Sequence, residues 1–157
     1  MIKNNRGVTL SALVVTIIVI MILAGITVST SDLLIKDTKA KSVVSNMYLV
    51  KGKAETLYED YQFSTAGVLP ASSDTLGQKV DVSTLTTYGV TSTGDTEVDS
   101  TWYRWGKSVL EANGLEPGML GGTAEFIVNY ATGDVIYTAG IRDDSGTVKY
   151  KLSQFTN

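Results

Sequence analysis

An uncharged apolar segment near the N-terminus constrains this chain more than any other feature. From Val8 to Val28, about 21 consecutive residues carry no charged side chain, and most of them are Val, Ile, Leu or Ala. A helix needs about 20 such residues to cross the hydrocarbon core of a bilayer. Because every backbone group must bond internally in lipid, β-branched residues that weaken a helix in water are tolerated there. The segment therefore predicts a transmembrane helix over residues 8–30.

The charges that flank this segment indicate its orientation. Lys3 and Arg6 precede it, which by the positive-inside tendency keeps the N-terminus cytoplasmic and places the C-terminus outside. A cleaved secretory signal is the alternative, with an apolar core of about 7–15 residues that ends at a small-x-small site. The core of this chain is longer, and Thr27–Ser29 is a poor cleavage site, so we favour a retained helix.

Composition excludes several kinds of function. The chain has 157 residues, a net charge of −3, and neither Cys nor His. The mildly acidic balance argues against a nucleic-acid surface. Without thiols and imidazoles there are no disulfides, no Ser–His or Cys–His catalysis and no typical zinc site. We therefore expect no enzyme and no cofactor, and one modest domain after the apolar segment.

The stretch RGVTLSALVVTIIVIMILAGI, residues 6–26, carries a specific family resemblance. It resembles the class III leader and N-terminal helix of type IV pilins and type II secretion pseudopilins, and is most similar to pilin-like proteins of Gram-positive, clostridia-like bacteria. In that family a membrane peptidase cuts after the Gly that ends a short basic leader and then methylates the new N-terminus. The resemblance implies a leader of residues 1–7, cleavage after Gly7 and methylation of Val8.

The resemblance also implies how the mature chain is used. A single-pass subunit would first reside in the cytoplasmic membrane with its C-terminus outside, and then join an extracellular filament on the cell surface. The implied partners are further copies or other pilins, the membrane, the prepilin peptidase and the pilus assembly machinery. The residues implied in assembly are Leu10, Ala12, Leu13 and Ile17.

Ala12 departs from the family pattern. Most major pilins carry Glu as the fifth mature residue, and this carboxylate is thought to pair with the N-terminal amine of a neighbouring subunit. A buried charge needs a partner, so the amine of Val8 must find other acceptors here. The chain is then either a minor or tip subunit, or one of a group that assembles without this contact.

A helical pattern continues beyond the apolar segment and predicts an amphipathic helix over residues 31–61. Its apolar stripe, at alternating spacings of three and four, consists of Ala40, Val43, Met47, Val50, Ala54, Leu57 and Tyr61. If it is continuous with the first helix, the whole would be roughly 80 Å long. A break near Ser29–Asp32 is the alternative, because Ser and Asp side chains compete for backbone hydrogen bonds.

The remaining residues, 62–157, predict a small β-rich domain. Residues 62–100 are rich in Ser, Thr, Gly and Asp and indicate an exposed connecting region with short strands at most. Residues 102–118 contain a short helix that ends at Asn113–Gly114, a favourable C-cap. The aromatic cluster Trp102, Tyr103 and Trp105 is interpreted as core packing, with a sugar-binding platform as the alternative.

Two hairpin patterns follow. Alternating apolar residues flank the turns at Thr132–Asp134 and Asp143–Gly146, which predicts a three-stranded antiparallel meander. In its last strand Val148, Tyr150 and Leu152 are expected to face the core, and Lys149 and Lys151 to face water. We therefore predict an α+β fold in which a long N-terminal α-helix packs on a small antiparallel β-sheet, as in pilins.

The adjacent acids Asp143 and Asp144 are the main candidate for a metal site. In a turn that contains Gly, such acids usually form the turn and remain solvated. A calcium site shared with Asp134 is the alternative, although the spacing is not that of an EF-hand.

Two functions remain open at this point. The first is a structural subunit of a type IV pilus or pilus-like filament, assembled through its N-terminal helix after leader cleavage. The second is a membrane-anchored extracellular binding module that does not polymerise.

Overall fold

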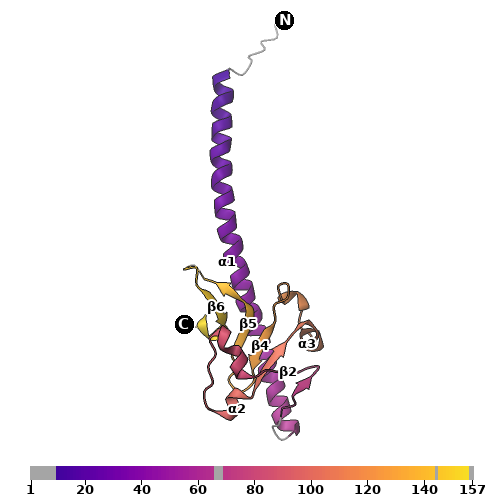
Figure 1. Cartoon of the computed structure of the whole chain (residues 1–157). Coiled ribbons are helices and arrows are strands. Elements are labelled where there is room, and N and C mark those ends of the chain that lie inside the picture. Colours follow the sequence, from indigo (N-terminus) through magenta and orange to yellow (C-terminus); the bar gives the residue numbers. More distant parts are fainter. Residues whose placement is uncertain (1–9, 66–68, 144, 156–157) are drawn as a thin grey trace. The chain divides into compact units, whose positions relative to one another are not determined.

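The computed structural model describes residues 10–65, 69–143 and 145–155, and for residues 10, 11, 22–37 and 65 it describes the backbone alone (Figure 1). The leader, with Gly7 and Val8, lies outside the described residues. The chain divides into two compact units, residues 1–39 and residues 40–157.

The N-terminal helix α1 spans Leu10–Thr65 and therefore contributes to both units. Its helical backbone includes residues 29–32, where a break in the helix was the alternative interpretation of the sequence. It ends four residues beyond the predicted position, because Gln62 to Thr65 continue the helix without a breaker. Among the side chains that the structure describes, no helix combines the length and apolar character of a membrane span. The transmembrane character of residues 8–30 stays a prediction.

The unit of residues 40–157 is built on one antiparallel sheet. Its strands follow one another in chain order: β1 (Ser72–Ser73), β2 (Gly77–Lys79), β3 (Trp102–Trp105), β4 (Phe126–Asn129), β5 (Val135–Arg142) and β6 (Val148–Lys151). The predicted meander is confirmed as β4–β5–β6, with Val128 opposite Val135 and Arg142 opposite Val148. The strands β1 to β3 extend this meander at the β4 edge. The chain therefore has an α+β fold, as predicted.

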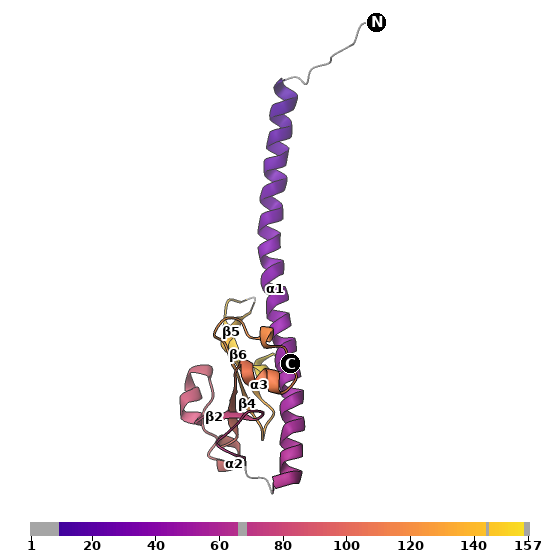
Figure 2. The same ribbon diagram turned by 90° about the vertical axis from the view of Figure 1, so that its right-hand side faces the viewer.

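One face of the sheet packs against α1, as Figure 2 shows. Met47, Val50 and Ala54 of the predicted stripe are buried, and the stripe residues Ala40, Val43, Leu57 and Tyr61 pack partly buried around them. They meet Trp105 and the other side chains of the same sheet face, which are Tyr103, Phe126, Val128, Val135 and Tyr137. The amphipathic half of the helix is thus confirmed, because one apolar stripe faces one apolar sheet surface.

The opposite face of the sheet is covered as well, which the sequence did not predict. The 3-10 helix η1 (Val82–Tyr88) lies on this face and inserts Leu85, which is fully buried (Figure 2). The side chains beneath it are Val80, Val90, Trp102, Ile127 and Ile136. The interpretation of residues 62–100 as an exposed connection is therefore wrong for this part, although the strands β1 and β2 are short as expected.

The aromatic cluster belongs to the core. Trp105 and Tyr103 are fully buried on the α1 side, whereas Trp102 is buried on the η1 side. The Trp105 Nε1–H donates to the Leu76 carbonyl at 3.0 Å and to the Tyr130 hydroxyl at 3.1 Å. The burial of all three side chains confirms the interpretation as core packing. It argues against a sugar-binding platform, because such a platform needs a ring face that is exposed to solvent.

Four further short helices lie between or after the strands in the part of the chain that the structure describes. The predicted helix before Asn113–Gly114 is α3 (Lys107–Ala112), with Asn113 as its C-cap and Gly114 at a positive φ. The others are α2 (Thr96–Asp99), η2 (Pro117–Met119) and, at the end of the described chain, η3 (Leu152–Gln154).

The prediction that Val148, Tyr150 and Leu152 face one way is wrong. Val148 is 36% exposed, Tyr150 packs partly buried on the η1 side of the sheet, and Leu152, which belongs to η3, is buried on the α1 side. Pairing between β5 and β6 shifts register between Ile136 and Ile141, so Val148 lies beyond the irregularity. Lys151 does not simply face water, since its Nζ donates to the Gly89 carbonyl at 3.0 Å.

Gly77, at the start of β2, gives a testable prediction of stability. It adopts a φ of +86°, and a Cβ on it would lie 2.3 Å from the Arg104 carbonyl oxygen. Gly77→Ala should therefore lower the free energy of unfolding by about 2–3 kcal/mol, through backbone strain together with the clash. Gly94→Ala, with a φ of +78° but open space around its Cβ, should lose only about 1 kcal/mol. Urea unfolding of both variants checks this, and equal losses would contradict the clash.

Candidate assembly surface and surface pocket

The N-terminal part of α1 presents an apolar surface on all its sides. Every side chain from Ala12 to Met21 is exposed, with Leu13 at 53% and Ile17 at 44%. Ten consecutive helical residues cover the whole circumference, because each turns about 100° from the last. A helix that is apolar all round is normally buried in a membrane or in a larger protein core. This segment, residues 12–21, is called the assembly surface below.

The polar residue within the assembly surface does not interrupt it. The Thr16 hydroxyl donates to the Leu13 carbonyl at 2.8 Å, so its hydrogen-bonding capacity is used within the helix. The sequence contains no charged side chain in this range. The surface can therefore be buried without leaving a charge unpaired.

The predicted assembly residues fall only partly within the described side chains. Leu13 and Ile17, four residues apart, share one face of the helix, and Ala12 stands beside them. For Leu10 only the helical backbone is described. The processing residues Gly7 and Val8 lie outside the described chain, so neither cleavage nor methylation is tested.

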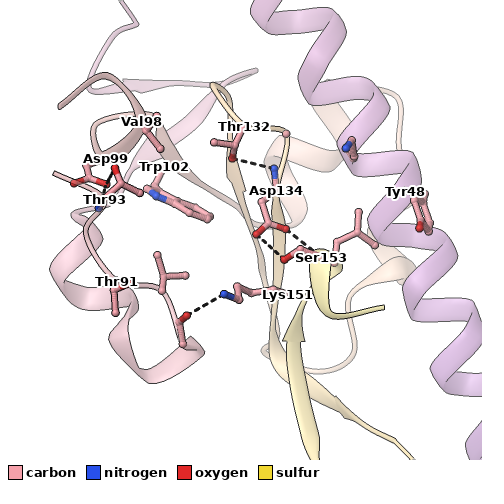
Figure 3. A pocket seen from close by; sticks show the side chains of 15 residues that line it. Tyr48, Thr91, Thr93, Val98, Asp99, Trp102, Thr132, Asp134, Lys151 and Ser153 are labelled. Atoms are coloured by element: carbon pink, nitrogen blue, oxygen red, sulfur yellow. Dashed lines mark hydrogen bonds between the residues drawn. The ribbon is translucent and has the colours of Figure 1, made fainter. Parts of the chain in front are cut away.

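A second candidate is a surface pocket of about 440 Å³ in the unit of residues 40–157 (Figure 3). Its apolar lining comes from Val90, Val98, Trp102 and Leu152. The rest comes from the loops around them and from Tyr48 and Lys51 of α1. These loops are far apart in sequence, so no local pattern could have predicted the pocket.

The polar groups of the pocket mainly hold its own walls together. Asp99 accepts hydrogen bonds, at 3.0 Å each, from the Thr93 amide and hydroxyl (Figure 3). It also accepts one from the Ser92 hydroxyl. These bonds, the one from Ser92 first, lower the pKa of Asp99. Asp134 in turn accepts from the Ser153 hydroxyl at 3.1 Å. These hydrogen bonds join the segments that line the pocket to one another.

The candidate calcium site is not assembled. Asp134 and Asp143 stand at opposite ends of β5, about 25–30 Å apart at about 3.3 Å per residue, so they cannot share an ion. Asp143 instead accepts hydrogen bonds from Ser145 and Thr147 and pairs with Lys149 at 3.5 Å. The Ser145 hydroxyl contributes most to lowering the pKa of Asp143. Asp144 lies outside the described residues, and the others contain no group of ligands for a metal.

Comparison of the chain with protein-family models, with curated proteins and with solved structures gives no match.

Proposed function

We propose that this chain is a structural subunit of a type IV pilus or pilus-like filament, assembled through its apolar N-terminal helix after removal of residues 1–7. The assembly surface of residues 12–21 is the observation that carries the proposal. The leader-like motif before it, and a helix that packs its amphipathic half on an antiparallel sheet, support the same function.

The assembly surface is favourable only where other apolar groups cover it. Burying one Val, Leu, Ile or Met side chain contributes about 1.5–3 kcal/mol, so eight exposed ones of these types represent more than 10 kcal/mol. The bilayer covers this surface as long as the subunit resides in the cytoplasmic membrane. Sister subunits then cover it in the extracellular filament, where packing of apolar helices replaces contact with lipid.

Processing after Gly7 provides the direct experiment. Mass spectrometry of the protein isolated from the cells that make it should find an N-terminus at methylated Val8. In the Gly7→Leu variant the leader should remain on at least nine-tenths of the molecules, because a bulky side chain blocks the peptidase. The conservative Val8→Ile variant should be processed normally. An intact Met1, or a cut near Ser29, in the unaltered protein would contradict the proposal.

A membrane-anchored binding module is the second candidate, and the pocket beside Trp102 is the observation that favours it. Electron microscopy of sheared cell-surface material separates the two functions. Filaments labelled by an antibody to residues 62–157 support the filament subunit. A protein that stays in the membrane as a monomer, with no labelled filaments, supports the binding module.

A further inference from the structure

The pocket beside Trp102 contains a buried hydrogen-bond donor that the fold does not use. Trp102 is only 5% exposed, yet its Nε1–H donates to no acceptor within the described residues. Trp105, in contrast, donates its Nε1–H to two acceptors. A buried polar group normally has a partner, so the unused N–H of Trp102 calls for an acceptor from outside the chain.

This free N–H opens into the pocket. Among the described side chains, no nitrogen or oxygen is both fully buried and without a partner, so the Nε1–H of Trp102 is reached by solvent. Trp102 lines the pocket of about 440 Å³. Figure 3 shows its indole ring on the pocket wall, between Thr93 and Asp99 on one side and Thr132 on the other. The donor is therefore available to a molecule that enters the pocket.

Other polar groups of the pocket also have hydrogen-bonding capacity left. Lys151 uses one of its three Nζ–H groups, which donates to the Gly89 carbonyl. Asp134 accepts three hydrogen bonds, from two backbone amides and the Ser153 hydroxyl, of the four or so that a carboxylate can accept. Thr91 is exposed, and its hydroxyl has no partner in the described part of the chain. Free donors and free acceptors therefore line one pocket.

The charges that line the pocket balance. Two cations, Lys51 and Lys151, stand against two carboxylates, Asp99 and Asp134. A charged ligand of either sign would meet repulsion as well as attraction, which favours a neutral ligand. The apolar lining adds that this ligand also presents C–H groups, as is usual in small-molecule sites.

We propose that this pocket binds a neutral carbohydrate, with one hexose unit seated in it. A hydroxyl both donates and accepts, so adjacent hydroxyls of one ring can accept from Trp102 and Lys151 and donate to Asp134 at the same time. The C–H groups of the ring then cover the apolar lining. This site differs from a stacking platform, because Trp102 contributes its N–H and its ring stays in the core.

The inference goes beyond the filament proposal and does not rest on it. The site belongs to the unit of residues 40–157, so a filament subunit and a membrane-anchored module would both display it. In a filament the site would recur in every copy, and several weak contacts to one glycan surface would add up to strong attachment.

Nuclear magnetic resonance of the ¹⁵N-labelled full chain, in micelles of a detergent without a sugar headgroup, tests the site. The chain contains two Trp residues, and Trp105→Phe assigns their two indole N–H signals. Without ligand, the N–H of Trp102 should exchange with water at least tenfold faster than that of Trp105, because only the latter is hydrogen-bonded within the protein.

Titration with the methyl glycosides of glucose, galactose and mannose should then move the Trp102 signal with at least one sugar and leave the Trp105 signal in place. The small size of a hexose sets an expected dissociation constant of about 1–10 mM. The methyl glycoside of the matching uronic acid, in which a carboxylate replaces the hydroxymethyl group, should bind at least fivefold more weakly. Equal or tighter binding of this anion would overturn the neutral ligand class.

Three variants locate the site, with binding followed on the sugar signals by saturation transfer. Thr91→Val and Thr87→Val both replace an exposed Thr by a side chain of the same shape, but only Thr91 lines the pocket. Thr91→Val should weaken binding at least threefold and Thr87→Val should leave it unchanged. Trp102→Phe removes the N–H and keeps most of the ring, so binding should fall at least tenfold while near-UV circular dichroism still shows a folded chain.

The outcomes separate this site from the filament function. Slow exchange of the Trp102 N–H, no shift of its signal up to about 100 mM of any of the three sugars, or equal shifts of both indole signals would each overturn the carbohydrate site. Equal binding by Thr91→Val and Thr87→Val would overturn it as well. Filaments without sugar binding leave the filament function standing, and sugar binding by a chain that forms no filaments leaves the site standing.

Discussion

Replacement of Trp105 by Ala is expected to lower the free energy of unfolding of the unit of residues 40–157 by about 3–5 kcal/mol. Trp105 is the largest of the fully buried side chains and lies between the sheet and α1. Its removal leaves a cavity that neighbouring side chains fill only in part. It also removes the Nε1–H group, which donates hydrogen bonds to the Leu76 carbonyl and to the Tyr130 hydroxyl.

Two further variants divide this loss into its causes. Trp105→Phe keeps most of the ring and loses the donor, and the Leu76 carbonyl still accepts from the Tyr130 hydroxyl at 2.8 Å. It should therefore lose only about 1–2 kcal/mol. Phe63→Ala, which truncates an exposed ring on α1, should change stability by less than about 0.5 kcal/mol.

Urea unfolding of the full chain in detergent micelles, followed by near-UV circular dichroism, measures all three. Stability of small domains is typically about 5–15 kcal/mol, so the Ala variant should unfold at much lower urea. A loss below about 1 kcal/mol for Trp105→Ala would show that the ring is not part of a closely packed core. A comparable loss for Phe63→Ala would show that the outward face of α1 is covered within the monomer.

Elements with strong local periodicity were predictable. The stripe that contains Met47, Val50 and Ala54 needs only the 3.6-residue repeat, and the burial of these residues follows from it. The turns between β4, β5 and β6 are marked by Gly and Asp at short spacing, which is again local information. The C-cap at Asn113 followed by Gly114 is of the same kind.

Elements that depend on distant pairing were not predictable in the same way. The strand β3 has Trp102 facing η1 and Trp105 facing α1, so both sheet faces are apolar and the usual polar alternation is lost. Its position is decided by pairing with β4, more than 20 residues later in the chain. η1 is likewise held by Leu85, which packs onto the face of the sheet, and the Ser- and Thr-rich sequence of η1 does not predict this contact.

The candidate sites differ in the same way, since one depends on a local sequence pattern and the other on contacts between distant residues. The assembly surface could be predicted because ten consecutive residues carry it, whereas the pocket draws on separate loops that only the fold brings together.

Replacement of Ile17 by Asp is expected to reduce the yield of sheared filaments at least tenfold. Ile17 lies in the middle of the assembly surface, and no cationic side chain occurs from Gly7 to Ser31 to pair with a carboxylate there, while the proposed amine of Val8 is nine residues away in the same chain. Placing a charged residue at the centre of a membrane helix costs about 2.5–3.5 kcal/mol on insertion scales. Among packed subunits an unpaired buried charge costs about 3–5 kcal/mol, and the cost recurs in every subunit.

Matched variants show whether this loss belongs to the assembly surface. Ile17→Leu keeps the apolar character and should leave the filament yield within about twofold, because volume-conserving apolar exchanges cost little. Lys107→Asp places the same new carboxylate on the exposed start of α3 and should have no effect on yield. Immunoblotting of sheared material with an antibody to residues 62–157 measures all three, and cell-bound protein serves as the expression control. If Ile17→Asp forms filaments as well as the unaltered chain, residues 12–21 are not what holds the subunits together, since a carboxylate cannot be buried there without a partner.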